Sequence, residues 1–469
     1  MLPVSIVLLE IVVFKNAWIL QNKYRFCKIL FILSAAFLFF IIYFHSDSLF
    51  NQLLYDHRPF NAFQRCLTEF RVLVLYLSLI VFPLTSRFSI EHYFNHSTSL
   101  LEPLSTLFCF GIIIILLITA FYSRKKYPLL SFALFFYFIN HSIESSFIGL
   151  ELAFEHRNYL PSIFLFVPFA LFIHGLIIKN KQTRVMGSVL VCSILIILGI
   201  STYNRNYVWN DLGGLWADAL KISPESGRVL FNYATLNLVP NGKHQDALDC
   251  FLASSNMGWH GNNNKKAVPF AEISALLKSR GKDKAALDYA RKALVNNPYD
   301  EGYVQDLFLL QLKNKLLDAA DFTSVILLDS DPKNSVFLNY KGFVSLKKGN
   351  PRKALNYFHT SLNNDLLNKN ALINTGYALN MLGNYKQAEI VLNIANTYYP
   401  ENSEILYQLL NNSLDMKISS SKYYCILILK KFTLVQIYNE LENRPTNPLA
   451  LKLNNTALVD FITDNLSEI

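Results

Sequence analysis

The densest set of reactive side chains in this sequence lies at 140–162, in the stretch NHSIESSFIGLELAFEHRNYLPS. Its imidazole, carboxylate, guanidinium and phenol groups belong to His141, Glu144, Glu151, Glu155, His156, Arg157 and Tyr159. On a helix, residues three or four apart share a face. This spacing pairs His141 with Glu144, and it also pairs Glu151 with Glu155. Carboxylates can coordinate a divalent cation, and an arginine oriented by a carboxylate can bind a lipid phosphate. The residue types therefore predict a phosphate or cation site, and the alternative interpretation is a polar loop solvated at a membrane edge.

The surroundings of this stretch are typical of a membrane domain. The chain is 52% hydrophobic and only 16% charged, whereas soluble globular proteins are about 25% charged, which excludes a wholly soluble enzyme as the default. Five uncharged runs are each about long enough to cross a hydrocarbon core of roughly 30 Å. We expect a spanning helix in each of 29–46, 103–123, 127–143, 158–178 and 185–204. A shorter apolar segment at 2–14 predicts part of a further helix.

Lysine and arginine set the orientation of these helices, because short basic loops stay on the cytosolic side of a membrane. The loops at 124–126 and 179–184 are basic, so the last helix carries everything after Tyr203 out of the cytosol. Segment 72–84 is predicted to be re-entrant or interfacial, since a full span there would place the basic stretch 15–28 outside. The sequence thus predicts a multi-pass membrane protein whose second half is periplasmic or lumenal, and the bacterial inner membrane is the expected location.

The charge balance also divides the chain after Tyr203. Residues 1–203 hold 15 basic and 9 acidic residues, and the other 266 hold 28 and 25. The resulting net charges of +6 and +3 leave no strongly basic domain, so nucleic acid is not an expected partner. The six cysteines show no metal-ligand spacing. We predict an all-α chain with a polytopic membrane domain at 1–203, a repeat array at 204–402 and a helical capping region at 403–469.

A repeat of about 34 residues organises the second half. A glycine or asparagine followed five residues later by alanine recurs as Gly242/Ala247, Gly281/Ala286, Asn314/Ala319, Gly349/Ala354 and Gly383/Ala388. Proline follows three of these alanines by twelve or thirteen residues. This spacing resembles the tetratricopeptide repeat, in which the glycine ends a first helix and the alanine lets a second helix pack closely. We expect five units over 225–402, stacked into an α-solenoid with a concave groove.

Three asparagines near one face of the expected first helices are candidates for binding a peptide in that groove. Asn232, Asn339 and Asn374 precede their repeat alanines by nearly the same interval. Side-chain amides there can hold the backbone of an extended peptide, whereas the alternative is that an asparagine-rich sequence places them by chance. The expected partners are therefore a protein or peptide in the groove and membrane lipid around the first half.

A second set of charged and imidazole groups is expected on the same outer face as the 140–162 stretch: Asp56, His57, Arg58, Arg87, Glu91, His92, His96 and Glu102. Because the two sets flank the predicted re-entrant segment, our hypothesis is that they line one cavity. No nucleophile elbow, phosphate-binding glycine loop or zinc-protease helix occurs in the sequence.

The order of these features resembles a known family. The membrane half has an Arg-x-x-x-x-Tyr-Leu string at 71–77, Pro83 beyond it, and the string EHRNYLPS at 155–162. Followed by extracytoplasmic repeats, this arrangement resembles the transmembrane and tetratricopeptide-repeat O-mannosyltransferases and their bacterial relatives with the GT-C glycosyltransferase fold. The resemblance covers nearly the whole chain. It implies transfer of a sugar from a polyprenyl-phosphate carrier to a protein hydroxyl, with a carboxylate base and cationic groups at the leaving phosphate.

The family's catalytic carboxylates lie in a first outer loop that has no counterpart here. The resemblance therefore implies a chain lacking the N-terminal catalytic part, or a split or non-catalytic relative. In the enzymatic interpretation, Glu155, His156 and Arg157 bind the carrier phosphate and the repeats bind the acceptor. The alternatives are a membrane-anchored scaffold that assembles envelope proteins, and a ligase or polymerase for carrier-linked polysaccharide. A polyprenyl-phosphate-linked sugar is the expected donor, and a divalent cation is an optional further ligand.

Overall fold

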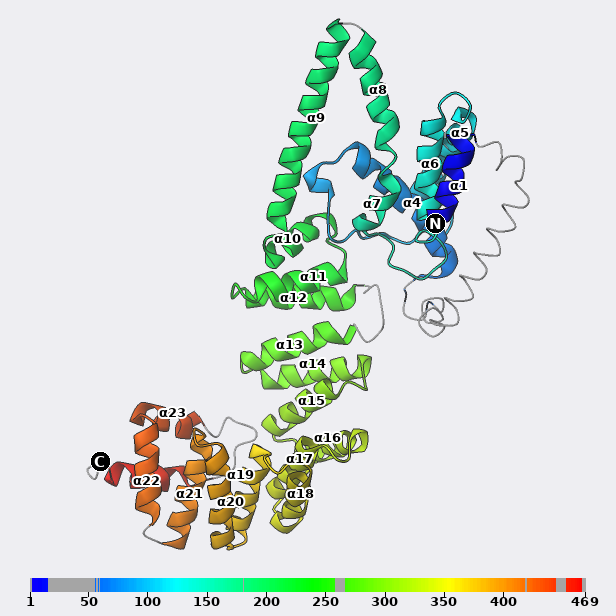
Figure 1. The fold of residues 1–469 in the computed structure, drawn as a ribbon. Helices are drawn as coiled ribbons and strands as arrows, with labels where there is room; N and C mark the ends of the chain where they lie inside the picture. Colours follow the sequence, from blue (N-terminus) through cyan, green and yellow to red (C-terminus); the bar gives the residue numbers. More distant parts are fainter. Residues whose placement is uncertain are drawn as a thin grey trace. The chain divides into compact units, whose positions relative to one another are not determined.

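Every regular element described by the computed structural model is helical (Figure 1), which confirms the all-α class predicted from the sequence. The described residues are 2–15, 55, 58, 60–179, 181–257, 266–417, 420–443 and 453–465. The span predicted at 29–46 lies outside them. The chain forms two compact units, Met1–Pro269 and Phe270–Ile469.

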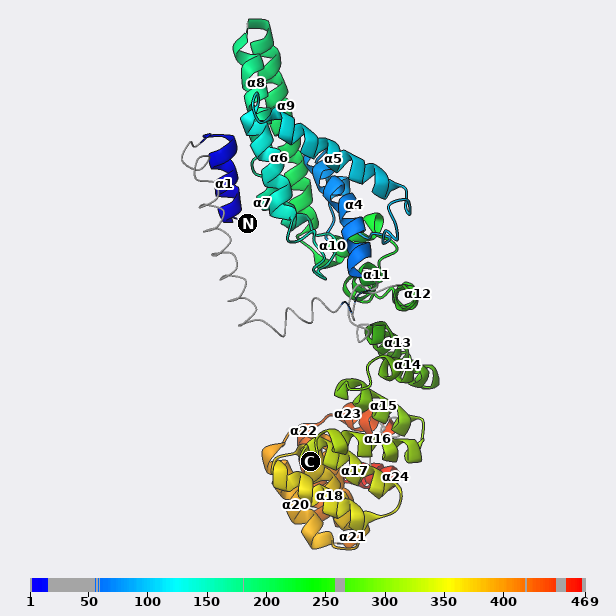
Figure 2. The same ribbon diagram turned by 90° about the vertical axis from the view of Figure 1, so that its right-hand side faces the viewer.

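The first unit begins with apolar helices. Their bounds are α1 Leu2–Val12, α4 Ala62–Val81, α5 Ser105–Ser123, α6 Pro128–His141, α8 Phe166–Lys179 and α9 Lys181–Val208. α6 packs against α1 and α5, α5 packs against α4, and α8 pairs with α9 (Figure 2). Leu73, Ile113 and Tyr137 form a small core where α4, α5 and α6 meet. Much of the remaining apolar surface of α5, α8 and α9 is exposed, as in helices that face lipid.

Two described helices are long and apolar enough to cross a membrane, α5 and the Gln182–Val208 part of α9. A third span results if Glu155–Ser162 and Phe166–Ile178, which are bent by 56° at their break, count as one. The run 127–143 instead forms the 14-residue helix α6, which rises only about 21 Å at 1.5 Å per residue. The described residues thus contain two or three helices able to span, fewer than the four runs predicted there, because a polar loop ends α6 early.

Segment 72–84 forms the second half of α4 and the turn that follows it. α4 starts with an asparagine-glutamine capping box and ends shortly before Pro83, which has no backbone N–H to continue the helix. Arg87 then donates hydrogen bonds to the carbonyl oxygens of Ser78 (3.0 Å) and Phe82 (3.1 Å). The chain therefore folds back onto the helix end, and the position of this segment relative to the membrane stays a prediction.

Short helices lie in the loop after α4, in the loop after α6 and after α9. They are the 3-10 helices Thr85–Arg87 and Glu155–Asn158, α7 Tyr159–Ser162, α10 Leu212–Ile222, α11 Gly227–Tyr233, the π-helical segment Ala234–Leu238 and α12 His244–Asn256. α11 and α12 pack as a pair, and Ser254 donates to the carbonyl oxygen of Gly227 at 2.6 Å. The turn between them contains Gly242 in the left-handed region, with φ +70°, and the buried Ala247 follows. The first predicted repeat turn is therefore present.

The second unit begins within α13 and is a stack of helix pairs. From α13 on, the helices are α13 Ala267–Ser279, α14 Asp283–Asn296, α15 Glu301–Lys313, α16 Leu317–Ser330, α17 Ser335–Lys347, α18 Pro351–Asn364, α19 Lys369–Met381, α20 Tyr385–Tyr398, α21 Ser403–Met416, α22 Ser420–Lys431, α23 Leu434–Asn443 and α24 Asn455–Asp464. The starts of α15, α17, α19 and α21 are equally spaced, with the tetratricopeptide period of about 34 residues. Each helix packs against the next along the chain from α14 to α22. This regular pairing confirms a solenoid of the tetratricopeptide type.

One repeat turn lies one residue later than predicted. Glycines hold the left-handed position in the other turns, with φ from +70° to +79°, at Gly242, Gly281, Gly349 and Gly383. In the third predicted unit the left-handed residue is Lys315 (φ +60°), not Asn314, and the fully buried alanine is Ala320, not Ala319. With Ala320, the last three alanine spacings are equal and each of the three prolines follows its alanine by the same interval.

The backbone bonds of that turn give the reason. Leu316 N donates to Gln311 O at 2.8 Å, as Asn350 N donates to Ser345 O at 3.0 Å in the next unit. This bond closes the end of the first helix only when the residue before the donor is left-handed. Asparagine tolerates that conformation better than lysine, but the packing of the alanine decides the register.

Side-chain volume is matched across the helix pairs. A Cβ added at Gly342 would lie 2.4 Å from the ring of Phe358, and one added at Gly376 would lie 2.5 Å from Cγ of Leu392. One repeat earlier the sizes are exchanged, because the first helix carries the buried Phe308 and the second carries Ser324 at the position of Phe358. Close packing of a small residue against a large one therefore recurs along the array.

The repeat spacing continues into 403–469, the region predicted to cap the array. α21 starts one full repeat after α19 and packs against α22. Its N-cap, Asn402, occupies the position held by Asp300, Asn334 and Asn368 in the preceding repeats. Tyr407 on α21 donates to Glu440 of α23 at 3.0 Å, and residues of α24 join the same hydrophobic core. A further repeat-like pair therefore precedes α23 and α24.

Candidate functional site

The 140–162 stretch folds as a loop held against α4 by Arg65. The side chain of Arg65 is fully buried. It donates hydrogen bonds to the carbonyl oxygens of Glu144 (2.6 Å), Ser146 (3.0 Å) and Leu150 (2.5 Å). Glu69, one turn along α4, lies 2.9 Å from Arg65, and burial raises the pKa of Glu69 to about 7 although Arg65 opposes this. A buried guanidinium thus fixes the backbone of the loop, which is not a merely solvated segment.

Two further ion pairs lie within this loop region. Arg58 Nη1 lies 2.8 Å from Glu151 Oε1. Arg157 Nη1 donates to the carbonyl oxygen of Glu151 at 2.6 Å, and Arg157 Nε lies 3.5 Å from Glu144 Oε2. The guanidinium also lies 5.0 Å from the ring centroid of Phe154, and the Arg157 side chain is only 11% exposed. Arg157, predicted to bind a phosphate, therefore uses its guanidinium inside the loop.

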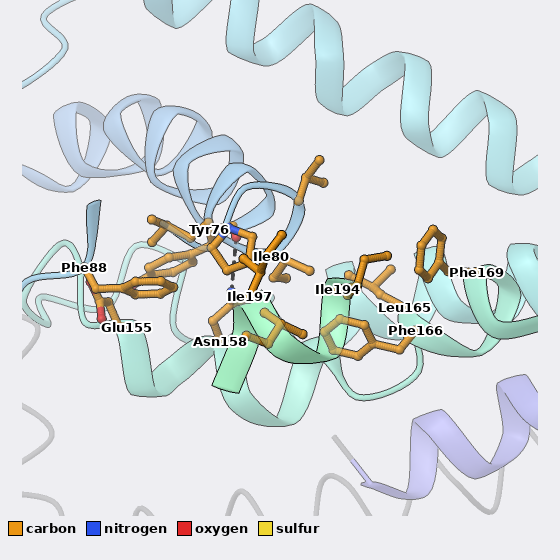
Figure 3. Close-up of a pocket in the computed structure, with 14 residues that line it drawn as sticks. Tyr76, Ile80, Phe88, Glu155, Asn158, Leu165, Phe166, Phe169, Ile194 and Ile197 are labelled. Carbon is orange, nitrogen blue, oxygen red and sulfur yellow. Dashed lines mark hydrogen bonds between the residues drawn. The ribbon is translucent and has the colours of Figure 1, made fainter. Parts of the chain in front are cut away.

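Glu155 is a predicted site residue that lines a cavity. The cavity has a volume of about 780 Å³, which is in the usual range for pockets that hold small molecules. It lies between α4, α8 and α9 (Figure 3). Most of its wall is apolar and includes Ile80, Phe88, Phe166, Phe169, Ile194 and Ile197. Glu155 and Asn158 supply polar groups at one end.

The carboxylate of Glu155 is oriented by the loop that precedes α5. Its Oε1 accepts hydrogen bonds from Ser89 N and from His92 Nε2, both at 2.7 Å. The side chain of His92 is 7% exposed, whereas that of Glu155 is 26% exposed. His92 of the second predicted set therefore bonds to Glu155 of the first set. Asp56 and His57 of the second set lie outside the described residues.

The backbone around Glu155 is fixed by α4. Tyr76 Oη accepts from Phe154 N at 2.7 Å and lies 2.9 Å from Phe154 O. Asn158 Nδ2 donates to the carbonyl oxygen of Tyr76 at 3.2 Å. These bonds hold the residues on both sides of Glu155, so the carboxylate has a defined position at the cavity.

The remaining predicted residues do not line the cavity. His141 is buried against aromatic rings of α4 and α6, and its Nε2 lies 3.3 Å from Asn158 Oδ1. His156 is exposed and stacks on the ring of Phe154. Tyr159 is 82% exposed. The seven predicted residues therefore separate into a loop network, one buried imidazole, two exposed side chains and one cavity carboxylate.

The charge of the cavity restricts its chemistry. Glu155 is the charged side chain of the lining, which contains neither lysine nor arginine. Across the described ranges, no group of three or more His, Cys, Asp or Glu is placed to hold a metal ion, and binding of a divalent cation stays a prediction. The cavity suits an apolar chain, and its carboxylate can accept a hydrogen bond or a proton from a head group.

Several residues that shape this site were not predicted from the sequence. Asn158 lies inside the EHRNYLPS string, so including every polar residue of that string would have found it. Arg65 and Ser89 carried no such signal, because their partners are far away in the chain.

Two of the three predicted groove asparagines bond to each other. Asn374 Nδ2 donates to Asn339 Oδ1 at 2.8 Å, and the two residues are 6% and 4% exposed. Asn232, in the first unit, donates to the carbonyl oxygen of Arg228 at 2.8 Å. Binding of a peptide by Asn339 and Asn374 requires this buried contact to open, and such binding stays a prediction.

Comparison with known proteins finds similarity only at the level of folded structures. No family model matches the sequence, and no curated protein matches it. The chain is similar to YrrB, described as a TPR protein with an unusual peptide-binding site, at 17% identity and TM-score 0.35, over 41% of this chain and 96% of that one. A tetratricopeptide repeat protein from Parabacteroides merdae gives 14% identity and TM-score 0.41, over 51% and 99%. TTC0263 from Thermus thermophilus gives 21% and 0.33, over 39% and 100%.

The class of protein follows from the chain's own geometry. Helix pairs repeat with a period of about 34 residues, their turns use left-handed residues, and each turn is followed by a buried alanine. The chain is therefore an all-helical protein that combines a tetratricopeptide-type solenoid with two or three apolar helices long enough to cross a membrane.

Proposed function

We propose that this chain serves protein glycosylation outside the cytosol. In this proposal the cavity between α4, α8 and α9 holds a polyprenyl-phosphate-linked sugar, and the repeats bind the acceptor protein. The observation that carries the proposal is the cavity, an apolar space of about 780 Å³ that ends at an oriented carboxylate. A polyprenyl tail is wholly apolar, and burying it gains roughly 25 cal/mol per Å² of surface removed from water.

The head group of the carrier lies at Glu155 in this proposal. The carboxylate accepts hydrogen bonds from sugar hydroxyls, because Ser89 and His92 hold it at the end of the apolar wall. Arg157 acts as a positioning residue, since its guanidinium binds Glu144 and the Glu151 backbone. The topology that accompanies this function places α5 and α9 across the bacterial inner membrane and the repeats on the periplasmic side, as the basic loops predict.

Binding of a fluorescent polyisoprenyl phosphate to the full chain in phosphatidylcholine nanodiscs tests the proposal. Leu198→Trp adds volume to the lining of the cavity and should weaken binding at least tenfold, which corresponds to about 1.4 kcal/mol. Ile200→Trp is the matched control, because Ile200 lies on the same helix, is 57% exposed and is not part of the lining. Equal affinities of wild type and both variants would exclude the cavity as the carrier site.

A membrane-anchored scaffold for envelope proteins is the second candidate. The observation that favours it is the use of Arg58, Arg65 and Arg157 in contacts that hold the loop, which leaves the cavity lining without a basic group for a phosphate. A glycosylation assay in cells that carry Glu155→Ala at normal protein level separates the two functions. Loss of glycan on exported proteins supports the first function, and unchanged glycosylation supports the scaffold.

A further inference from the structure

Residues 89–93 connect the cavity to the first helices after α9, and we name this segment the strap. On its cavity side, Ser89 N and His92 Nε2 both donate to Glu155 Oε1 at 2.7 Å. Ser89 is 4% exposed, so this end of the strap is enclosed by protein. The bonds join residues 63 and 66 positions apart in the chain, and they therefore depend on the fold and not on sequence proximity.

On its other side the strap is bonded to the turn between α10 and α11. The carboxylate of Glu91 pairs with Arg228, and Ser226 Oγ lies 3.5 Å from Glu91 Oε1. Ser223 Oγ donates to the carbonyl oxygen of Glu91 at 2.9 Å and accepts from Tyr93 N at 3.1 Å. Glu91 is 4% exposed, and burial raises its pKa although Arg228 opposes this. Three hydrogen bonds thus attach the strap to the turn between α10 and α11, and the ion pair of the buried Glu91 attaches it to Arg228 at the start of α11.

A second contact from α11 reaches the residue next to Glu155. Cζ of Arg228 lies 5.9 Å from the ring centroid of Phe154, and Cζ of Arg157 lies 5.0 Å from the same centroid. Phe154 directly precedes Glu155 and donates its N–H to Tyr76 Oη at 2.7 Å. Arg228 therefore contacts both the strap and the side chain of Phe154, the residue that precedes the cavity carboxylate.

We propose that the strap couples Glu155 to the helices that follow α9, so that a head group bound at Glu155 changes how firmly α10 and α11 are held. The identity of that ligand rests on the proposed function, whereas the coupling does not. A ligand hydroxyl that binds Glu155 Oε1 competes with Ser89 and His92 for the same oxygen, and Glu91 lies between these two residues. Displacing either donor therefore moves the group that binds Arg228.

The coupling acts in both directions. If bound carrier changes the equilibrium for attachment of α10 and α11 by some factor, this attachment changes the affinity for the carrier by the same factor. An acceptor that changes the attachment therefore also changes carrier binding. Coupled sites typically change each other's affinity by about 5- to 150-fold. The strap would thus link loading of the donor to recognition of the acceptor.

Amide hydrogen exchange of α10 and α11 in the full chain tests the strap without any ligand, because exchange reports local opening. Glu91→Gln removes the carboxylate charge that pairs with Arg228 and should raise exchange rates there at least tenfold. Glu155→Ala should raise them at least fivefold, while Glu155→Gln keeps an oxygen that accepts both hydrogen bonds and should stay within twofold of wild type. Glu102→Ala is the control, since Glu102 is exposed and bonds to Thr98.

The double variant Glu91→Gln/Glu155→Ala should exchange no faster than Glu91→Gln alone, within twofold, because both changes release the same link. The proposal is overturned if Glu155→Ala behaves like Glu102→Ala, or if the two effects multiply. Either result would show that the cavity and α11 are held independently.

A second measurement uses a polyisoprenyl phosphate in phosphatidylcholine nanodiscs as the probe. Saturating probe should change exchange in α10 and α11 of the wild type at least fivefold, and should leave it unchanged in Glu91→Gln although that variant binds the probe within threefold of wild type. Probe that binds without any change in the wild type overturns the strap and leaves the proposed function standing. Probe that fails to bind counts against the proposed function, and the ligand-free variants then decide on the strap.

Discussion

The repeat array and the 140–162 loop are stabilised in opposite ways. In the array many interactions recur from one repeat to the next, such as the side-chain N-caps at Asp300, Asn334, Asn368 and Asn402. Around the loop the main contacts occur once and join distant positions, as Arg65 binds the carbonyl oxygen of Leu150 and Ser89 binds Glu155. Periodic patterns therefore report local packing, whereas a cluster of charged residues acquires its roles from partners far away in the chain.

The largest loss of stability is expected at Arg65, because this one side chain binds three carbonyl oxygens of the loop. Arg65→Met leaves three loop carbonyl oxygens without their donor and Glu69 without its charge partner, and breaking such a buried pair costs about 3–5 kcal/mol. Thermal unfolding in detergent measures the loss. Arg71→Met on the same helix is the control, since Arg71 donates to a single carbonyl oxygen, that of Asn95. Equal losses in both variants would contradict a special role for Arg65.

A smaller loss is expected when the matched volumes of the array are disturbed. Gly342→Ala forces a Cβ into the ring of Phe358, and overpacking of this kind costs about 1–3 kcal/mol. Chemical unfolding of the full chain, monitored through amide exchange in α17 and α18, measures this loss of stability. Adding Phe358→Leu should recover part of the loss, and a double variant that is as unstable as the sum of the two single changes would contradict volume matching.

Removing one N-cap should cost less again. Asn368 accepts a hydrogen bond from Ala371 N at 3.0 Å, so Asn368→Ala should destabilise the array by about 1 kcal/mol. The control is Asn363→Ala, because Asn363 is exposed on α18 and surface changes usually stay within about 0.5 kcal/mol. Indistinguishable unfolding curves for the two variants would show that the recurring caps add nothing.

The smallest effects on carrier binding are expected at His156 and Tyr159, the exposed residues of the 140–162 loop. His156→Ala and Tyr159→Phe should change binding of the polyisoprenyl phosphate less than twofold, because neither residue lines the cavity. Glu155→Ala should weaken binding at least tenfold in the same assay. A tenfold loss in His156→Ala would mean that the head group lies outside the cavity end assigned to it.

The parts of the fold that depend on local pattern could be predicted from the sequence. The all-α class, the length of the repeat unit and the four turns with a glycine follow from the spacing of residues. The turn at Lys315 was predicted one residue too early, because lysine is not a residue type that indicates a left-handed conformation. Proline followed two positions later by aspartate or asparagine, at 298–300, 332–334 and 400–402, would have located three N-caps and shown that the repeat continues into α21.

The candidate site was less predictable for a physical reason. The sequence indicated that charged groups gather on the outer face, but charge alone does not tell which carboxylate faces a cavity. Glu151 is paired with Arg58, and Glu155 is oriented by residues that come much earlier in the chain. Such roles depend on tertiary packing that no local spacing encodes.

Photo-crosslinking of the carrier tail tests whether the cavity between α4, α8 and α9 holds a polyprenyl chain. A polyisoprenyl phosphate with a diazirine on its tail is irradiated with the full chain in nanodiscs, and the labelled peptides are mapped by mass spectrometry. We expect labelling at Phe166, Phe169 and 194–198. Unlabelled carrier should compete with this labelling, and Leu198→Trp should reduce it, whereas Ile200→Trp should not. Labelling spread over the exposed apolar faces of α5 and α9, unaffected by competitor or by Leu198→Trp, would contradict this expectation.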